Sequence, residues 1–191
     1  FLEREKQQVF SDETKNALAD SNPFEDVIQY VHESKLLKDF ERILYLSLKL
    51  YLQDDILVKV DRASMANSLE VRVPYLDHTF VEYVAGLPSL YKLRGFTTKY
   101  LLKKATQNVL PKEIVQRKKK GFGIPLSKWF HGELKTMLLS YLSEERITKA
   151  GIFHYPYIKS LLDEHFARKC DHRKQLWPLL VFEMWREQYL S

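Results

Sequence analysis

The 191 residues are 45% hydrophobic and 29% charged, which excludes disordered and fibrous classes and allows one domain or a large part of a bigger one. The longest apolar run, residues 177–182, is far shorter than the roughly 20 residues that span a bilayer, so we expect no membrane partner. The net charge of +5 is uneven, because residues 92–120 hold ten Lys or Arg and one Asp or Glu.

The compartment is predicted from cysteine usage. A single cysteine, Cys170, cannot form an internal disulfide, which favours a reducing compartment, and we expect the cytoplasm. The chain opens Phe1-Leu2-Glu3-Arg4, without an initiator Met or the pattern of a signal peptide, and we expect it to be part of a longer polypeptide.

Apolar residues recur at helical spacing through most of the chain, which predicts a mainly α fold. Residues 40–53 are apolar on most sides and predict a buried central helix. A second helix is expected from about Asp55 to Asn67, burying Ile56, Leu57, Val60 and Met65.

The segment after the second predicted helix carries a different pattern. Leu69, Val71 and Val73 alternate with Glu70 and Arg72, and Pro74 disfavours a helical conformation at Val73, so we expect an extended piece. Its Glu/Arg side needs partners or a ligand, and the alternative is an internal ion-pair network that braces the helices. Asp77 then suits the N-cap of a short helix that Gly86 and Pro88 end.

The basic stretch contains one lysine at an unfavourable position. Thr97 or Thr98 can cap a helix that buries Leu101 and Leu102, which places Lys99 in its first turn. A cation there opposes the helix macrodipole at a cost of roughly 0.3–1 kcal/mol. A phosphate at this helix start would turn the defect into an anion site, and the alternative is an exposed lysine that tolerates the dipole.

The C-terminal part predicts helices packed on a core. The pattern of i, i+3, i+4 and i+7 spacing is typical of such helices, and we interpret its aromatic members as packing residues: Ile158, Leu161, Leu162, Phe166, Trp177, Leu180, Val181, Met184 and Trp185. Pro178 requires the last helix to begin close to it or to kink. The six histidines form no His-x-x-x-His pair, so we expect no metal site.

The longest motif of the chain covers residues 52–78, Leu52-Gln53-Asp54-Asp55-Ile56-Leu57-Val58-Lys59-Val60-Asp61-Arg62-Ala63-Ser64-Met65-Ala66 and then Ser68-Leu69-Glu70-Val71-Arg72-Val73-Pro74-Tyr75-Leu76-Asp77-His78. Further motifs follow in order: Lys99-Tyr100-Leu101-Leu102, Leu110-Pro111, Arg117-x-Lys119-x-Gly121-Phe122-Gly123-x-Pro125 with Trp129, and Leu176-Trp177 with Phe182-Glu183-Met184-Trp185. From about residue 40 onward, this series resembles the C-terminal part of bacterial-type glutamine-hydrolysing asparagine synthetases.

The resemblance implies a fold and a reaction. Residues 1–191 would be the C-terminal helical portion of an α/β adenine-nucleotide (PP-loop ATP pyrophosphatase) synthetase domain. Such an enzyme activates the carboxylate of aspartate with ATP as an acyl-adenylate, releases pyrophosphate, and uses ammonia from glutamine to form asparagine. The Ser-Gly-Gly-x-Asp-Ser loop and the nucleophilic cysteine of the glutaminase domain do not occur in this sequence. The partners would therefore be the preceding glutaminase and PP-loop regions, with the Mg²⁺ ligands also upstream, and the chain alone would be inactive.

The resemblance also implies site residues. Lys99 matches the lysine that contacts the phosphates and stabilises charge during adenylation and acyl transfer. Arg117, Lys119 and Gly121 match a basic loop that could close over the nucleotide. Charged signature positions are carried over as a scaffold beside the site, without a catalytic role: Asp61, Arg62, Glu70, Arg72 and Asp77.

Several alternatives stay open at this point. A relative that amidates a sugar uronate, or one that closes a β-lactam ring, could contain the same helical piece. Outside enzymes, the basic stretch could belong to a helical nucleic-acid-binding module, which steep salt dependence of DNA binding would indicate, although we expect no nucleic-acid partner. A homodimer is expected by family analogy alone.

Overall fold

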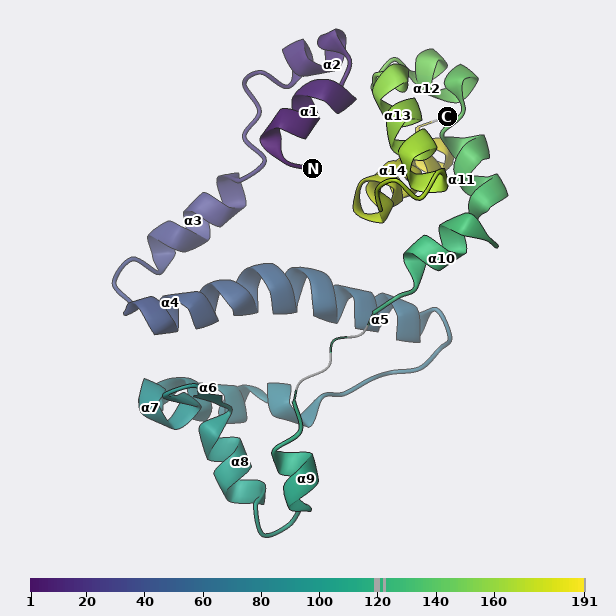
Figure 1. Ribbon diagram of the computed structural model, residues 1–191. Helices are drawn as coiled ribbons and strands as arrows, with labels where there is room; N and C mark the ends of the chain where they lie inside the picture. Colours follow the sequence, from purple (N-terminus) through teal and green to yellow (C-terminus); the bar gives the residue numbers. More distant parts are fainter. Residues whose placement is uncertain (119–120, 122, 191) are drawn as a thin grey trace. The chain divides into compact units, whose positions relative to one another are not determined.

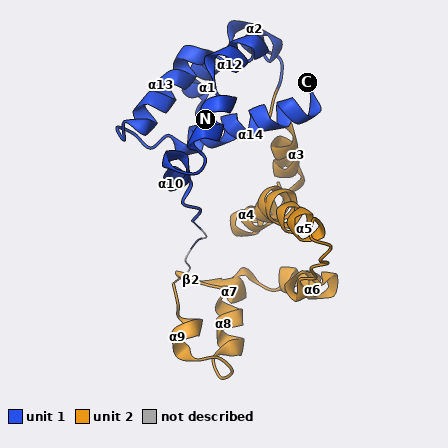
Figure 2. Ribbon diagram, turned by 90° about the vertical axis from the view of Figure 1, so that its right-hand side faces the viewer, with its two compact units in different colours: residues 1–21, 121–191 blue, residues 22–120 orange. Residues whose placement is uncertain are grey.

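The structure is a computed structural model that describes residues 1–118, 121 and 123–190, and it is mainly helical, as predicted (Figure 1). The chain divides into two compact units (Figure 2). Unit 1 comprises residues 1–21 and 121–191, and unit 2 comprises residues 22–120. Unit 2 therefore lies in sequence between the two pieces of unit 1.

Unit 1 consists of helices around one apolar core. Its helices are α1 (Glu3–Val9), α2 (Asp12–Ala17), α10 (Leu126–His131), α11 (Lys135–Tyr141), α12 (Glu144–Ala150), α13 (Tyr155–Phe166) and α14 (Arg173–Tyr189). Side chains from α10 to α14 fill the core and are almost inaccessible to solvent, among them Phe130, Leu138, Ile147, Ile158, Leu176 and Leu180. This burial stabilises unit 1, since each such side chain removed from water contributes roughly 1.5–3 kcal/mol.

The first residues of the chain are part of this core, although their sequence is the least distinctive. Val9 is buried at the end of α1, and its carbonyl oxygen accepts a hydrogen bond of 2.8 Å from the backbone N–H of His154. Phe10 pairs with Phe153 in an isolated β-bridge, and their rings stack with centroids 5.8 Å apart. Residues 1–21 are therefore tied to the segment between α12 and α13.

The predicted apolar stripe of the C-terminal helices is partly confirmed. Ile158, Leu161, Leu162 and Leu180 are buried. Trp177, Val181, Met184 and Trp185 remain 39–47% exposed, because α14 faces the core with Leu176, Leu179, Leu180 and Glu183. The two tryptophans still pack against neighbouring rings, Trp177 against Phe130 and Trp185 against Phe182. Pro178 lies inside α14, five residues after its start, so the helix does not begin close to the proline.

Unit 2 contains a long helical stretch followed by short elements. Its elements are α3 (Glu25–Glu33), α4 (Asp39–Leu46), the π-helix η1 (Ser47–Leu57), α5 (Val58–Met65), the 3₁₀ turn η2 (Pro74–Leu76), α6 (His78–Gly86), α7 (Ser89–Lys92), β1 (Leu93–Arg94), β2 (Thr97–Thr98), α8 (Tyr100–Thr106) and α9 (Lys112–Val115). The antiparallel strands β1 and β2 pair Leu93 with Thr98 and Arg94 with Thr97.

The long helix of unit 2 corrects two predictions. The predicted break between residues 53 and 55 is absent from the described helix, because η1 connects α4 to α5 without interruption. Nor is this helix buried: Val60 is 38% and Met65 53% exposed, and Ile56 and Leu57 are only half-buried. Helix α3 packs alongside α4, and Ser89 of α7 donates a hydrogen bond of 2.8 Å to Glu41, but these contacts leave no described residue of the long helix buried.

The local signals after the long helix are confirmed. Residues 69–73 are non-helical, with Val73 extended, as the alternation and Pro74 predicted. The Asp77 carboxylate caps α6 by accepting hydrogen bonds from the backbone N–H groups of Thr79 and Phe80, at 3.1 and 3.2 Å. Helix α6 ends at Gly86, and Pro88 follows.

Candidate functional site

Lys99 lies at the junction of the β1–β2 hairpin and α8, immediately before the helix, whereas the prediction placed it in the first turn. Thr97 and Thr98 form β2 instead of capping the helix, so Lys99 occupies the N-cap position and not the first turn. The predicted burial of Leu101 and Leu102 was also wrong. Their side chains are 37% and 41% exposed, because no described element covers this face of α8.

The backbone of Lys99 is in the left-handed region, with φ 55° and ψ 37°. This conformation costs a non-glycine residue about 1–2 kcal/mol. Ser68 and Arg168 also have positive φ, but both follow the end of a helix, where this conformation is an ordinary cap. Lys99 is the one such residue at a helix start in the described chain, and backbone strain of this kind motivates a hypothesis of function.

The hairpin and the first turn of α8 hold the Lys99 backbone in place. Gly95, with φ +57°, is the first of two loop residues between β1 and β2, the arrangement of a tight turn that needs glycine. Arg94 Nη1 donates a hydrogen bond of 2.6 Å to the Tyr100 hydroxyl, and its guanidinium lies 5.1 Å from the ring centroid. The Lys99 side chain is exposed, and its ammonium makes no hydrogen bond or ion pair with any described residue.

A groove of about 620 Å³ lies between α8 and α9. Its lining contains three lysines and no carboxylate: Thr97, Tyr100, Lys103, Lys104, Gln107, Asn108, Lys112, Val115 and Gln116. None of the three lysines forms an ion pair with a described residue. This lysine groove can attract a polyanion, and amide groups beside the lysines can donate hydrogen bonds to phosphate oxygens. Lys99 does not line it.

Sequence reasoning did not single out the lysine groove. Lys103 and Lys104 lie in the last turn of α8, and Lys112 begins α9. The available signal was Leu110-Pro111, because Pro111 stands at the N-cap of α9 and so separates the two short helices that flank the groove.

The carried-over residues of the long motif lie on one continuous piece of unit 2, but the structure does not bring them into one cluster. Asp61 and Arg62 are exposed on α5 and form no ion pair within the described chain. Glu70 and Arg72 pair with each other at 2.7 Å, with side chains 68% and 87% exposed. An ion pair so exposed contributes little stability, so it does not brace the helices.

Asp77 has a structural role in this chain. Hydrogen bonds from the Thr79 hydroxyl and from the backbone N–H groups of Phe80 and Thr79 lower the pKa of its carboxyl group. These bonds favour the ionised form, which also suits the positive end of the α6 dipole.

The predicted basic loop is divided between the units. Arg117 belongs to unit 2, is exposed and has no ion-pair partner among the described residues, whereas Gly121 belongs to unit 1. Lys119 lies outside the described residues. A Cβ atom added at Gly121 would meet nothing within 4 Å, so contacts in this chain do not explain why the position is glycine.

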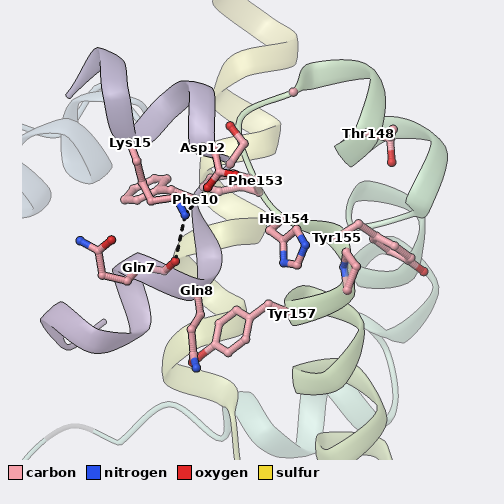
Figure 3. Close-up of a pocket in the computed structure, with 13 residues that line it drawn as sticks. Gln7, Gln8, Phe10, Asp12, Lys15, Thr148, Phe153, His154, Tyr155 and Tyr157 are labelled. Carbon is pink, nitrogen blue, oxygen red and sulfur yellow. Dashed lines mark hydrogen bonds and ion pairs between the residues drawn. The ribbon is translucent and has the colours of Figure 1, made fainter. Parts of the chain in front are cut away.

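Two further pockets belong to unit 1 and contain none of the predicted site residues. The first, of about 730 Å³, lies between residues 7–15 and 148–157 (Figure 3). In it Lys15 donates a hydrogen bond of 3.3 Å to the Gln7 carbonyl and pairs with Asp12 at 2.6 Å, so its cation is already neutralised. The second pocket, of about 560 Å³, lies beside His131 and His165.

The described residues contain neither a candidate metal cluster nor a candidate membrane-spanning helix. No three His, Cys, Asp or Glu side chains gather there in a way that could hold a metal ion. None of the described helices combines the length and the apolarity that crossing a membrane requires.

Comparison with known proteins assigns residues 2–187 to one family. The family model described as asparagine synthase matches residues 2–187. Asparagine synthetase [glutamine-hydrolyzing] 1 of Bacillus subtilis is 34% identical over 183 residues, which cover 93% of this chain and 29% of that protein. A putative asparagine synthetase [glutamine-hydrolyzing] of Mycobacterium tuberculosis is 35% identical over 78% of this chain and 23% of its own length. The asparagine synthetase [glutamine-hydrolyzing] of Gallus gallus is 30% identical over 73% of this chain and 27% of its own.

The chain thus spans less than a third of the length of the curated relatives that it matches. No solved structure matches it.

Proposed function

The chain belongs to the asparagine synthase family, and on that basis we propose that it forms part of an ATP-dependent amidotransferase that converts aspartate to asparagine with glutamine-derived ammonia. The polypeptide outside the matched segment would supply the glutaminase, the pyrophosphate loop and the Mg²⁺ ligands. We place the reaction in the cytoplasm and expect a homodimer of the complete enzyme, which light scattering tests.

Lys99 carries the proposal. A strained backbone places it at a helix start, and its ammonium has no partner among the described residues, in the most basic part of the chain. A polyphosphate would supply that partner. The cationic groups nearby in sequence, Arg94, Lys103, Lys104 and Arg117, favour a negatively charged ligand for the same reason.

The reaction proceeds in two displacements. A carboxylate oxygen of aspartate attacks the α-phosphorus of ATP and displaces pyrophosphate, and ammonia then attacks the acyl carbon and displaces AMP. Negative charge develops on phosphate oxygens in both steps, and a preorganised ammonium such as that of Lys99 stabilises it. Arg117 with Lys119 and Gly121 would close over the nucleotide and exclude water, while Asp61, Arg62, Glu70, Arg72 and Asp77 would form the charged surroundings.

The described residues are suited to bind the phosphates of ATP and not to coordinate Mg²⁺. Lys99 and Arg117 offer unpaired cations, whereas the described residues provide no cluster of three metal ligands. We therefore assign no step of this chain to Mg²⁺.

The test is Lys99→Ala in the complete enzyme. We expect pyrophosphate release and asparagine formation to fall about 10²–10³-fold, the scale of a lost charge-stabilising donor. Lys99→Arg should retain part of the activity because it keeps the charge, and Lys35→Ala, a change of an exposed lysine elsewhere in unit 2, should have no effect. Activity of Lys99→Ala within twofold of the unmodified enzyme would remove Lys99 from the mechanism.

Two further measurements test the proposal. The 191-residue chain alone should show no ATP-dependent pyrophosphate release, and turnover by it would contradict the division of the site. In the complete enzyme, faster reaction with another carboxylate than with aspartate would favour a related amidotransferase.

A further inference from the structure

The lysine groove is a concave surface whose positive charge is not neutralised. Helices α8 and α9, which form it, lie side by side (Figures 1 and 2). Lys103 and Lys104 line it from α8, and Lys112 lines it from α9. Glu113, the one acidic residue between positions 92 and 120, does not line the groove and forms no ion pair within the described part of the chain. Ammonium groups gathered around one cavity repel each other, and a bound anion would remove that repulsion.

Lys103 shows the missing counter-charge most clearly. It is half-buried, whereas Lys104 and Lys112 are exposed, and its ammonium makes no hydrogen bond or ion pair with any described residue. Partial removal of water from an ammonium group is unfavourable unless an acceptor replaces that water. The macrodipole of α8 favours Lys103 and Lys104 in its last turn, but Lys112 lies outside that helix, so the dipole does not account for the whole cluster.

The other lining residues indicate which kind of anion the groove suits. Three amide side chains stand among the lysines and can donate hydrogen bonds to phosphate oxygens: Gln107, Asn108 and Gln116. Val115 is the one aliphatic residue of the described lining, so an apolar ligand would find little to contact.

The aromatic content of the groove argues against a nucleic acid or a nucleotide. Tyr100 is the one aromatic residue of the described lining. The Arg94 guanidinium lies 5.1 Å from the centroid of its ring and also donates a hydrogen bond to its hydroxyl. Single-stranded nucleic acids bind by stacking successive bases on several aromatic side chains, which this groove does not offer. A bare chain of phosphates needs only the cations and the amide donors.

The groove is also distinct from the position of Lys99. Thr97 and Tyr100, which precede and follow Lys99 in the sequence, line the groove, whereas Lys99 does not. We propose that the lysine groove is a second anion site that binds a linear inorganic polyphosphate of at least three phosphate groups, so that each of its three lysines contacts phosphate oxygens. This inference goes beyond the proposed function and does not depend on the role of Lys99 in it.

Amide hydrogen exchange in the complete enzyme tests the second anion site. Inorganic tripolyphosphate is added in the absence of ATP and Mg²⁺, and exchange is followed in residues 100–116, which contain α8 and α9. We expect exchange in this segment to slow by at least about threefold, because the bound ligand would stabilise the packing of the two helices. No slowing with tripolyphosphate would overturn the proposal.

Two other anions test the specificity of the groove. Sulfate at the same ionic strength should slow exchange in residues 100–116 much less than tripolyphosphate, because a single small anion cannot contact all three lysines. Equal slowing by sulfate would reduce the effect to general screening of charge and would overturn the site. A short single-stranded oligonucleotide that slows exchange at a lower concentration than tripolyphosphate would also overturn the proposal, because the ligand would then be a nucleic acid.

Matched double variants locate the site. Lys103→Gln with Lys112→Gln should raise the tripolyphosphate concentration for half-maximal slowing by at least about tenfold, because two of the three ammonium groups are lost. Lys35→Gln with Lys38→Gln changes the net charge equally, at two exposed lysines elsewhere in unit 2, and should leave this concentration within about twofold. Equal weakening by the two double variants would show an effect of net charge alone and would overturn the site.

Lys99→Ala separates this proposal from the catalytic one. It should leave the slowing by tripolyphosphate unchanged, even where it abolishes asparagine formation. Slowing that disappears in Lys99→Ala but persists without Lys103 and Lys112 would place the phosphates at Lys99 and refute the groove alone. Normal asparagine formation by Lys99→Ala, together with slowing that still requires Lys103 and Lys112, would refute only the role of Lys99.

Discussion

Units 1 and 2 contain comparable lengths of mainly helical chain, but only unit 1 has a core. All the buried apolar side chains of the described residues belong to unit 1, from Val9 to Leu180. Unit 2 has the longer helical stretch and the family's charged signature, but none of its described apolar residues is buried. The difference teaches that helical periodicity specifies an apolar face without specifying what covers it.

The greatest difference between the units should appear on truncating an aromatic residue. Phe130, fully buried in unit 1, packs beside His165 and Trp177, so Phe130→Ala should lower the free energy of unfolding of unit 1 by about 3–5 kcal/mol. Tyr51→Ala in unit 2 should change it by less than about 0.5 kcal/mol, because Tyr51 is 61% exposed. Urea unfolding followed by tryptophan fluorescence reports unit 1, which contains Trp129, Trp177 and Trp185. Equal losses of unfolding free energy in the two variants would contradict this difference between the units.

A smaller effect is expected from the ion pair in the core of unit 1. Glu183 is fully buried and accepts hydrogen bonds from Arg186 at 2.7–3.3 Å. Arg186→Met would leave a buried carboxylate without its partner, and we expect a loss of about 3 kcal/mol, the low end of the usual range, because Arg186 is partly exposed. Arg173→Met is the control, since its partner Asp171 is 44% exposed, and it should cost no more than about 0.5 kcal/mol. Similar losses for both variants would show that burial does not set the strength of these pairs.

The smallest effect is a pH dependence confined to unit 1. Burial lowers the pKa of His165, and electrostatic interactions with His131, His172 and Arg173 lower it further, against the opposing effect of Asp171. The unfolded chain therefore binds the proton more readily than the folded one, so stability is complete above the ordinary histidine pKa of about 6.5 and falls as the pH drops below it. Urea midpoints at pH 7.5 and 5.5 measure the change, which His165→Gln should reduce. A higher midpoint at pH 5.5 would contradict the sign.

Local signals in the sequence predicted the local structure well. Asp77 caps α6 and Gly86 ends it because both effects depend on residues within one or two turns. The error at Lys99 arose from one unrecognised turn. Gly95 in the string Leu93-Arg94-Gly95-Phe96-Thr97-Thr98 permits a two-residue hairpin loop, which uses both threonines as strand residues and moves the helix start by one position.

Burial could not be predicted from the same patterns. Leu180 and Val181 are neighbours with similar side chains, yet the first is fully buried and the second 43% exposed, because α14 turns one face toward α10, α11 and α13. Val60 and Met65 fit the predicted helical stripe and are nevertheless 38% and 53% exposed. For the candidate site, the resemblance identified Lys99 and the charged signature, but the lysine groove depends on how two short helices meet, which spacing along the chain does not reveal.

The connection between the two ends of unit 1 has a consequence for biosynthesis. Glu5 accepts a hydrogen bond from Gln175, 170 positions later in the chain, and Val9 bonds to His154. Because a ribosome adds about 5–20 residues per second, residues 1–21 emerge many seconds before the segment that holds them. Unit 2 is synthesised during that interval with its leucines and valines open to water. The nascent chain must therefore remain competent to fold until α14 leaves the exit tunnel, and it should be a substrate for chaperones until then.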